Sequence, residues 1–307
     1  MNDFLRDKRQ KAPRLAELLR GREPILAPGA YDALTARMIE QAGFPAVYMT
    51  GFGTSASLLG RPDVGLLTMS QMVDNARRIA QAVDVPVIAD ADTCYGNPLN
   101  VIRTVQEYEL AGVSAIHIED QVTPKKCGHM ENKQVVPAVE MAEKIHAAVE
   151  ARSSSDFLII ARTDARAVEG LDAALRRARA YREAGADILF IEAPQNEDEV
   201  AQVARAFSDV PLLFNWAEGG KTPPMPLGRL TEFGYRIIIF PISTLLTAAK
   251  AIRATLDEIK AHGTPARLFP DRSSFQQFNE MIGLAEIQQV EKRFGTKEER
   301  YAGKAND

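Results

Sequence analysis

The sequence has few cysteines, no surplus of positive charge and no long apolar run, and each absence excludes a class of protein. Only two of the 307 residues are cysteine, Cys94 and Cys127, so a disulfide framework is not indicated. The formal net charge of −4 at pH 7 provides no basic surface for nucleic-acid phosphates. No run approaches the roughly 18–20 apolar residues that cross a bilayer. We therefore expect a cytoplasmic protein with free thiols and with neither a nucleic acid nor a membrane as partner.

Eight short apolar runs, each followed by turn or polar residues, predict eight strands. They are ILAPG from Ile25, AVYMTG from Ala46, VPVIADAD from Val85, AIHIED from Ala115, FLIIARTD from Phe157, ILFIEA from Ile188, PLLFNW from Pro211 and RIIIFP from Arg236. Amphipathic helical patterns lie between them, at residues 33–42, 70–82, 136–151, 170–184 and 198–207. This alternation predicts an α/β fold, a single-domain (β/α)₈ barrel of the TIM type over residues 24–262. A doubly wound open sheet is the alternative, but no glycine-rich nucleotide loop follows the first strand.

Both ends of the chain carry helical patterns outside the predicted barrel. The first 20 residues lack the apolar centre of a secretory signal and predict an amphipathic surface helix. Residues 263–295 predict further helices with an apolar face, made by Phe275, Phe278, Met281, Ile282, Leu284, Ile287 and Val290. An apolar face outside a finished barrel needs cover, so we expect an oligomer. The polar residues 296–307 are expected to be mobile.

Polar residues end nearly every predicted strand, and barrel active sites lie at the carboxyl ends of the strands. In chain order they are Tyr31, Thr50, Gly51, Asp90, Asp92, Glu119, Arg162, Glu192, Asn215 and Ser243. The carboxylates Asp90, Asp92 and Glu119 would repel one another unless a hard cation lay between them, which indicates Mg²⁺ or Mn²⁺ rather than Zn²⁺. The alternative is that these acids cap helices or pair with Arg162.

The segment after the fourth strand places a thiol between cationic side chains. Lys125, Lys126, Cys127, Gly128 and His129 are consecutive, and such neighbours lower the pKa of a thiol. The alternative is a solvated basic loop with an incidental cysteine, and residue chemistry alone does not choose between the two. By contrast, we interpret His117 as a satisfied core histidine. The segment GFGTSAS at residues 51–57 is only superficially similar to a glycine-rich loop, and we interpret it as offering backbone N–H groups to a carboxylate.

The segment KKCGH, preceded by HIEDQ, resembles the active-site loop of the isocitrate lyase and phosphoenolpyruvate mutase superfamily. The resemblance extends over residues 28–255 and includes IADADTCYGN, ARTDARAVEGLDAA, FIEAP and NWAEGGKTP. It implies a homotetramer whose C-terminal helices are exchanged between paired subunits. That arrangement would explain the apolar face near the C-terminus.

The resemblance also implies a role for each residue at the barrel mouth. Mg²⁺ would be held by Asp90, Asp92, Glu119 and Asp63. The pyruvate half of the substrate would be bound by Thr50, Gly51, Phe52 and Arg162, and the other half by Gly128, His129, Glu192 and Asn215. Pro241 and Ser243 follow the last strand and would complete the substrate site. Cys127 would be the general acid, Tyr31 or Lys125 the base, and Lys125, His129 and Arg162 would stabilise negative charge.

Within the superfamily, the cysteine loop favours lyases that cleave a small dicarboxylate, 2-methylisocitrate or 2,3-dimethylmalate, to pyruvate plus succinate or propionate. Thr50 and Phe52 replace the serine and glycine that 2-methylisocitrate lyases tend to carry, and Phe52 should narrow the site. The segment MTGFGTSASLLG at residues 49–60 is more similar to carboxyphosphonoenolpyruvate mutases and the dimethylmalate lyase group. The alternatives are an oxaloacetate acetylhydrolase, a carboxyphosphonoenolpyruvate mutase and a non-catalytic binding barrel.

Overall fold

The computed structural model describes residues 14–128, 130–271 and 273–295. The described residues up to Thr247 belong to one compact unit, and those from Ala248 onward belong to a second. This division falls before residue 262, where the sequence predicts the end of the barrel, and the single-domain boundaries stay a prediction. His129, the first 13 residues of the predicted surface helix and the predicted mobile tail at residues 296–307 lie outside the described residues.

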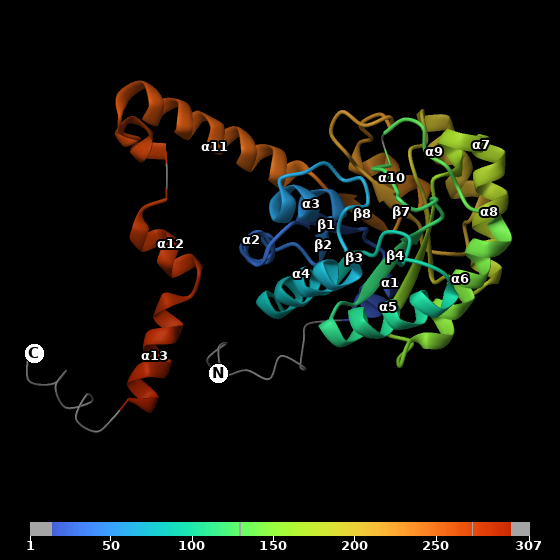
Figure 1. The fold of residues 1–307 in the computed structure, drawn as a ribbon, viewed down its shortest axis with the longest axis horizontal. Coiled ribbons are helices and arrows are strands. Elements are labelled where there is room, and N and C mark those ends of the chain that lie inside the picture. The colour runs from blue at the N-terminus through green and yellow to red at the C-terminus, as the bar shows by residue number, and fades with distance from the viewer. Residues whose placement is uncertain (1–13, 129, 272, 296–307) are drawn as a thin grey trace, which may run out of the picture. The chain divides into compact units, whose positions relative to one another are not determined.

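The first unit is built on an eight-stranded parallel sheet (Figure 1). Its strands are β1 (Ile25–Ala30), β2 (Val47–Met49), β3 (Val87–Asp90), β4 (Ala115–Glu119), β5 (Leu158–Thr163), β6 (Ile188–Ile191), β7 (Leu213–Asn215) and β8 (Ile237–Phe240). They pair in the order β6-β5-β4-β3-β2-β1-β8-β7, and a parallel bridge between Leu189 and Leu212 joins the two edges. Each strand overlaps one of the eight apolar runs. The predicted (β/α)₈ barrel is therefore confirmed.

Helices follow the strands and surround the barrel (Figure 1). The helices of the first unit are α1 (Leu15–Arg20), α2 (Ala33–Gln41), α3 (Gly51–Leu59), α4 (Met69–Ala82), α5 (Pro98–Ala111), α6 (Ala138–Ala151), α7 (Ala165–Glu169), α8 (Leu171–Glu183), α9 (Glu197–Ala206) and α10 (Leu227–Phe233). Side-chain caps determine where several of them begin: Asp32 accepts a hydrogen bond from the backbone of Thr35, and Asn196 does so from Glu199. The five predicted helical segments match α2, α4, α6, α8 and α9 to within two residues.

Two apolar clusters hold the barrel together. One lies between the strands and the surrounding helices, and the other fills the barrel interior with strand residues such as Ile88, Ile160 and Ile237. Leu15 of α1 is fully buried and belongs to the interior cluster, together with residues at the beginnings of the strands. The described part of the predicted surface helix therefore closes the amino end of the barrel, which leaves the carboxyl end for the cavity.

The second unit is helical. Helix α11 (Ser243–His262) leads into it, and the 3₁₀ helix η2 (Ala266–Asp271), α12 (Phe275–Met281) and α13 (Leu284–Phe294) follow. Apolar side chains on α12 and α13 are exposed, with Phe275 86% and Phe294 63% accessible. Among the described helices, none has the length and apolar character needed to cross a membrane.

Candidate active site

A cavity of about 260 Å³ opens at the carboxyl ends of the barrel strands. Its volume lies slightly below the roughly 300–1,000 Å³ of pockets that take drug-sized ligands, so it suits a small organic acid. The residues that line it include eleven that the sequence singles out: Thr50, Phe52, Asp63, Asp90, Lys125, Cys127, Gly128, Arg162, Glu192, Asn215 and Pro241. Barrel closure brings these residues together from widely separated parts of the chain.

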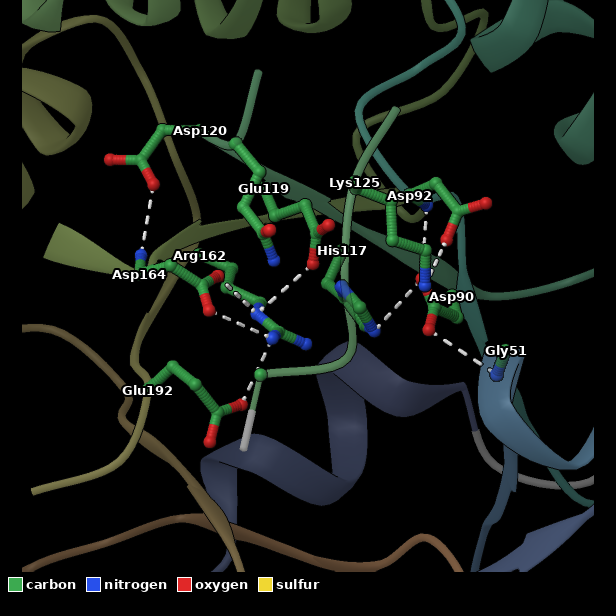
Figure 2. Close-up of polar contacts among 12 residues, drawn as sticks. Gly51, Asp90, Asp92, His117, Glu119, Asp120, Lys125, Arg162, Asp164 and Glu192 are labelled. Atoms are coloured by element: carbon green, nitrogen blue, oxygen red, sulfur yellow. Dashed lines mark hydrogen bonds and ion pairs between the residues drawn. The ribbon is translucent and has the colours of Figure 1, made fainter. Parts of the chain in front are cut away.

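Asp90 at the end of β3, Asp92 just after it and Lys125 lie close together (Figure 2). Asp90 accepts hydrogen bonds from the backbone N–H groups of Asp92 and Gly51, at 2.9 and 3.2 Å. The Lys125 ammonium lies 2.8 Å from an Asp92 carboxylate oxygen and 2.6 Å from Asp63. Lys125 therefore links the loop after β4 to the end of β3 and to the loop between α3 and α4.

Burial and neighbouring opposite charges shift the pKa values of these three groups in opposite directions. Burial disfavours the charged form of Lys125, but Asp92 and Asp63 outweigh it and raise the pKa of Lys125 well above its ordinary value. Lys125 is therefore a cation at neutral pH. Burial raises the pKa of Asp92 to about 6 although Lys125 opposes the shift. Burial acts in the same direction on Asp90, but His117 and Lys125 lower the pKa of Asp90 below its ordinary value.

Arg162, near the end of β5, lies among three carboxylates (Figure 2). Its guanidinium donates two hydrogen bonds to Asp164, at 2.9 and 3.2 Å, and lies 3.3 Å from both Glu119 and Glu192. Burial opposes its charge, but these carboxylates, Asp164 first, raise the pKa of Arg162 well above its ordinary value. Burial raises the pKa of Glu119 well above its ordinary value, and its Oε1 is buried without a hydrogen-bond partner. A Cβ at Gly128 would collide with the Arg162 guanidinium, so only glycine lets the loop lie this close.

A buried tyrosine–histidine pair adjoins Asp90, and sequence reasoning missed the tyrosine. The Tyr48 hydroxyl lies 2.8 Å from His117 Nε2, and His117 lies 3.5 Å from Asp90. Burial lowers the pKa of His117 to about 4, so its ring is neutral at neutral pH. The sequence predicts that His117 is a satisfied core histidine, but only one of its two ring nitrogens has a hydrogen-bond partner, because Nδ1 is buried without one. Tyr48 lines the cavity, and its place two residues before the polar end of the AVYMTG run is the signal that could have identified it.

Five residues singled out by the sequence are not among those that line the cavity: Tyr31, Gly51, Asp92, Glu119 and Ser243. Three of them, Gly51, Asp92 and Glu119, contact residues that do line it. Ser243 is the first residue of α11, and Tyr31 directly follows β1. The roles expected for Tyr31 and Ser243 stay predictions, and so does that of His129, which lies outside the described residues.

The segment GFGTSAS is helical and forms most of α3. The Thr50 side chain caps the helix by accepting a hydrogen bond from the backbone of Gly53, at 3.2 Å, and small residues then follow without a break. The start of α3 lies at the cavity end of the barrel, where the backbone N–H of Gly51 donates to the protein's own Asp90 carboxylate. A Cβ at Gly51 would collide with the Asp90 carboxylate, so this close approach requires glycine.

The carboxylate oxygens around Asp90 suit a hard divalent cation that keeps part of its water shell. Among the described residues, no three Asp, Glu, His or Cys side chains lie close enough to form a cage made of protein alone. Mg²⁺ is commonly held by one or two carboxylates and several waters. Asp92 Oδ1 and Glu119 Oε1 are buried without hydrogen-bond partners, although Lys125 lies within ion-pair distance of the first. Six buried carboxylates also outnumber three buried cations here: Asp63, Asp90, Asp92, Glu119, Asp164 and Glu192 against Lys125, Lys133 and Arg162.

Cys127 lies half-buried in the cavity wall, where its backbone N–H donates to the carbonyl of Asp63 at 3.2 Å. The sequence predicts that the flanking lysines make this thiol more acidic. In the structure each ammonium has another partner: Lys125 has two aspartates, and Lys126 donates to the carbonyl of Asn132 at 2.9 Å. The activation of Cys127 by its neighbours stays a prediction.

Comparison with known sequences adds a family match. The chain matches the protein-family model described as phosphoenolpyruvate phosphomutase over residues 15–260. It is 49% identical to a 2,3-dimethylmalate lyase of Eubacterium barkeri, covering 93% of this chain and 98% of that protein. It is 42% identical to a 2-methylisocitrate lyase of Aeropyrum pernix, covering 95% of this chain and 94% of that protein.

Solved structures show the same fold in other enzymes. An oxaloacetate acetylhydrolase bound to 3,3-difluorooxalacetate superimposes with a TM-score of 0.85 at 40% identity, over 92% of this chain and 97% of that one. A phosphonopyruvate hydrolase bound to oxalate and Mg²⁺ superimposes with a TM-score of 0.83 at 32% identity, over 91% of this chain and 97% of that one. The likeness therefore covers nearly the whole length of each protein.

Proposed function

Because the chain belongs to the phosphoenolpyruvate phosphomutase family, within the isocitrate lyase and phosphoenolpyruvate mutase superfamily, we propose that it is a carbon–carbon lyase of 2-hydroxy dicarboxylates. The substrate is of the 2,3-dimethylmalate or 2-methylisocitrate type, and the products are pyruvate plus propionate or succinate. The observation that carries the proposal is a single cavity where Asp90, Lys125, Cys127 and Arg162 meet, in a chain 49% identical to a 2,3-dimethylmalate lyase.

A divalent cation, Mg²⁺ or Mn²⁺, is part of this proposal. Asp90 and Asp92 would hold it, and it would lower the pKa of the substrate's 2-hydroxyl group and offset the surplus of carboxylates. Asp63 supports these residues through Lys125, which contacts both Asp63 and Asp92. The unpartnered Glu119 Oε1 would serve as a further acceptor for water near the ion.

Cleavage breaks the bond between the hydroxyl-bearing carbon and its neighbour. The hydroxyl oxygen gives its proton to a base, for which the sequence offers Tyr31 or Lys125, and becomes the pyruvate ketone. The electron pair of the broken bond stays on the departing fragment as an enediolate. Lys125 and Arg162, both held as cations, stabilise this charge. Cys127 then gives its thiol proton to the carbanionic carbon. Since Lys125 is protonated, we assign it to charge stabilisation rather than to proton removal.

The remaining cavity residues hold the two halves of the substrate. Thr50, Gly51 and Phe52 lie at the start of α3, where backbone N–H groups favour a carboxylate. Across the cavity, the Asn215 amide donates to Glu192 at 3.2 and 3.3 Å, and Asn215 Oδ1 is buried without a partner. We assign the Asn215 Nδ2 group to donate to the carboxylate of the fragment that leaves, because that fragment carries only acceptor oxygens. Gly128, Pro241 and Ser243 complete this side, with His129 as a further expected contact.

An oxaloacetate acetylhydrolase is the second candidate, since such an enzyme shares 40% identity and the fold. Purified protein with Mg²⁺ is expected to release pyruvate from 2,3-dimethylmalate or 2-methylisocitrate, measured by coupled NADH oxidation, and to stop when EDTA removes the metal. Oxaloacetate is supplied in parallel, with oxalate and acetate measured. Oxalate and acetate from oxaloacetate, without pyruvate from either hydroxy acid, would replace the lyase with the hydrolase. A metal-independent rate would contradict the assigned cation.

We propose further that the protein is a homotetramer that exchanges its C-terminal helices between paired subunits. The support is the set of exposed apolar side chains on α12 and α13, where Phe275 is 86% accessible. Burying such side chains against another subunit contributes about 1.5–3 kcal/mol each. Light scattering coupled to size-exclusion chromatography is expected to show a tetramer. A monomer across the accessible concentration range would remove this proposal and leave the lyase proposal standing.

A further inference from the structure

A buried lysine holds the loop that carries Cys127, and the proposed chemistry does not use it. The side chain of Lys133 is 1% exposed, and its ammonium donates to the backbone carbonyl of Gly128 and, at 2.6 Å, to Asp164. Lys133 is not among the residues that line the cavity. Its effect on a bound substrate must therefore pass through other residues.

Asp164 connects this lysine to Arg162. The Asp164 carboxylate accepts both hydrogen bonds of the Arg162 guanidinium (Figure 2). One of its oxygens also accepts the hydrogen bond from Lys133. Asp164 is itself fixed, because its backbone N–H donates to Asp120 at 2.9 Å. Burial alone would raise the pKa of Asp164, but Arg162 and Lys133 lower it below its ordinary value, so the carboxylate stays charged between two cations.

We propose that Lys133 is a positioning residue, which fixes the Cys127–Gly128 backbone against Arg162 through the carboxylate that both cations share. Gly128 has no side chain to separate it from Arg162, so any shift of the loop changes this contact directly. Cys127 is the adjacent residue, and its thiol moves with the same backbone. Hydrogen bonds from a buried ammonium are strong enough to hold such a position. The inference rests on the proposed function in one respect, the role of Cys127 as acid.

Another buried lysine offers a matched control. The Lys144 side chain on α6 is 5% exposed, and its ammonium lies 3.9 Å from Glu140, one turn earlier in the same helix. Lys144 is not among the residues that line the cavity. Lys144→Met therefore removes an equal charge from a similarly buried lysine outside the loop that carries Cys127.

The test compares Lys133→Met with Lys144→Met in the metal-loaded enzyme. For Lys133→Met we expect kcat to fall about 10²-fold, with a much smaller change in KM, because misplacement of a reacting group by about 1 Å has an effect of that size. We also expect iodoacetamide to alkylate Cys127 faster in the substrate-free protein, as measured by peptide mass spectrometry. Lys144→Met should change neither quantity.

The alkylation rate separates this inference from the proposed function, because it needs no turnover. Unchanged alkylation of Cys127 in Lys133→Met would overturn the positioning role, whatever the enzyme's activity. Faster alkylation in a protein without lyase activity would support the positioning role and remove the proposed function. If Lys133→Met does not fold, Lys133→Gln carries the same test, because its amide keeps a donor for Gly128 without the charge; we expect intermediate values for both quantities.

Discussion

Replacing Cys127 by serine is expected to lower kcat by about 10³-fold, within the range that positioned acids contribute. A serine hydroxyl is a much weaker acid than a thiol, so protonation of the departing carbon slows. The change should leave KM and the thermal midpoint nearly as they are, since Cys127 is half-buried in the cavity wall rather than packed in the core. Steady-state pyruvate release and a thermal unfolding scan measure the two effects.

The other cysteine supplies the control for this substitution. Cys94 is fully buried in the apolar cluster between strands and helices, and burial raises the pKa of its thiol. Cys94→Ala should therefore cost about 1 kcal/mol of stability and leave turnover largely intact. Full activity in Cys127→Ser would contradict the role of the Cys127 thiol as the general acid. Equal loss of activity in both variants would point to a general effect on the fold.

Replacing Arg162 by methionine is expected to lower both turnover and stability. The change removes the cation shared by Asp164, Glu119 and Glu192 and leaves their charges buried, a loss of about 3–5 kcal/mol in the free energy of unfolding at neutral pH. Arg162 opposes the effect of burial on Glu119 and is the largest charge that lowers the pKa of Asp164, so without it the folded-state pKa of each of these two carboxyls rises relative to the unfolded state. The folded state then binds more protons, so its stability falls as pH rises. The loss should therefore be smaller near pH 5 than near pH 7 in urea titrations.

A matched arginine lies at the opposite end of the barrel. Arg152, just before β5, is largely buried and binds Asp187 at 2.5 Å and the carbonyl of Phe157 at 2.9 Å. Arg152→Met should cost about 1–3 kcal/mol, in the range for charged hydrogen bonds, and retain turnover because these contacts are remote from the cavity. A pH-independent loss in Arg162→Met, no larger than that of Arg152→Met, would contradict the shared-cation account.

Much of the fold is visible in the sequence because its signals are local. A strand buried on both faces needs a continuous apolar run, and all eight such runs became strands. N-terminal caps such as Asp32 and Asn196 are also local, so the predicted helices begin close to the observed positions. The candidate site is predictable to the same extent, because parallel strands deliver their last residues to one end of the barrel. Asp90, Arg162 and Asn215 were identified in this way.

Contacts between distant segments are different, because local patterns carry no information about them. Tyr48 contacts His117 and Lys133 contacts Asp164 only because barrel closure and the loop after β4 bring them together. The ion pairs of Lys125, one of two candidate bases, are likewise formed with two carboxylates on other segments, which raise the pKa of Lys125. The sequence by itself determined the barrel and which residues reach its mouth, since hydrophobic burial and strand polarity follow local order. Only the tertiary structure decided how those residues pair, because partners and protonation depend on buried neighbours far away in the chain.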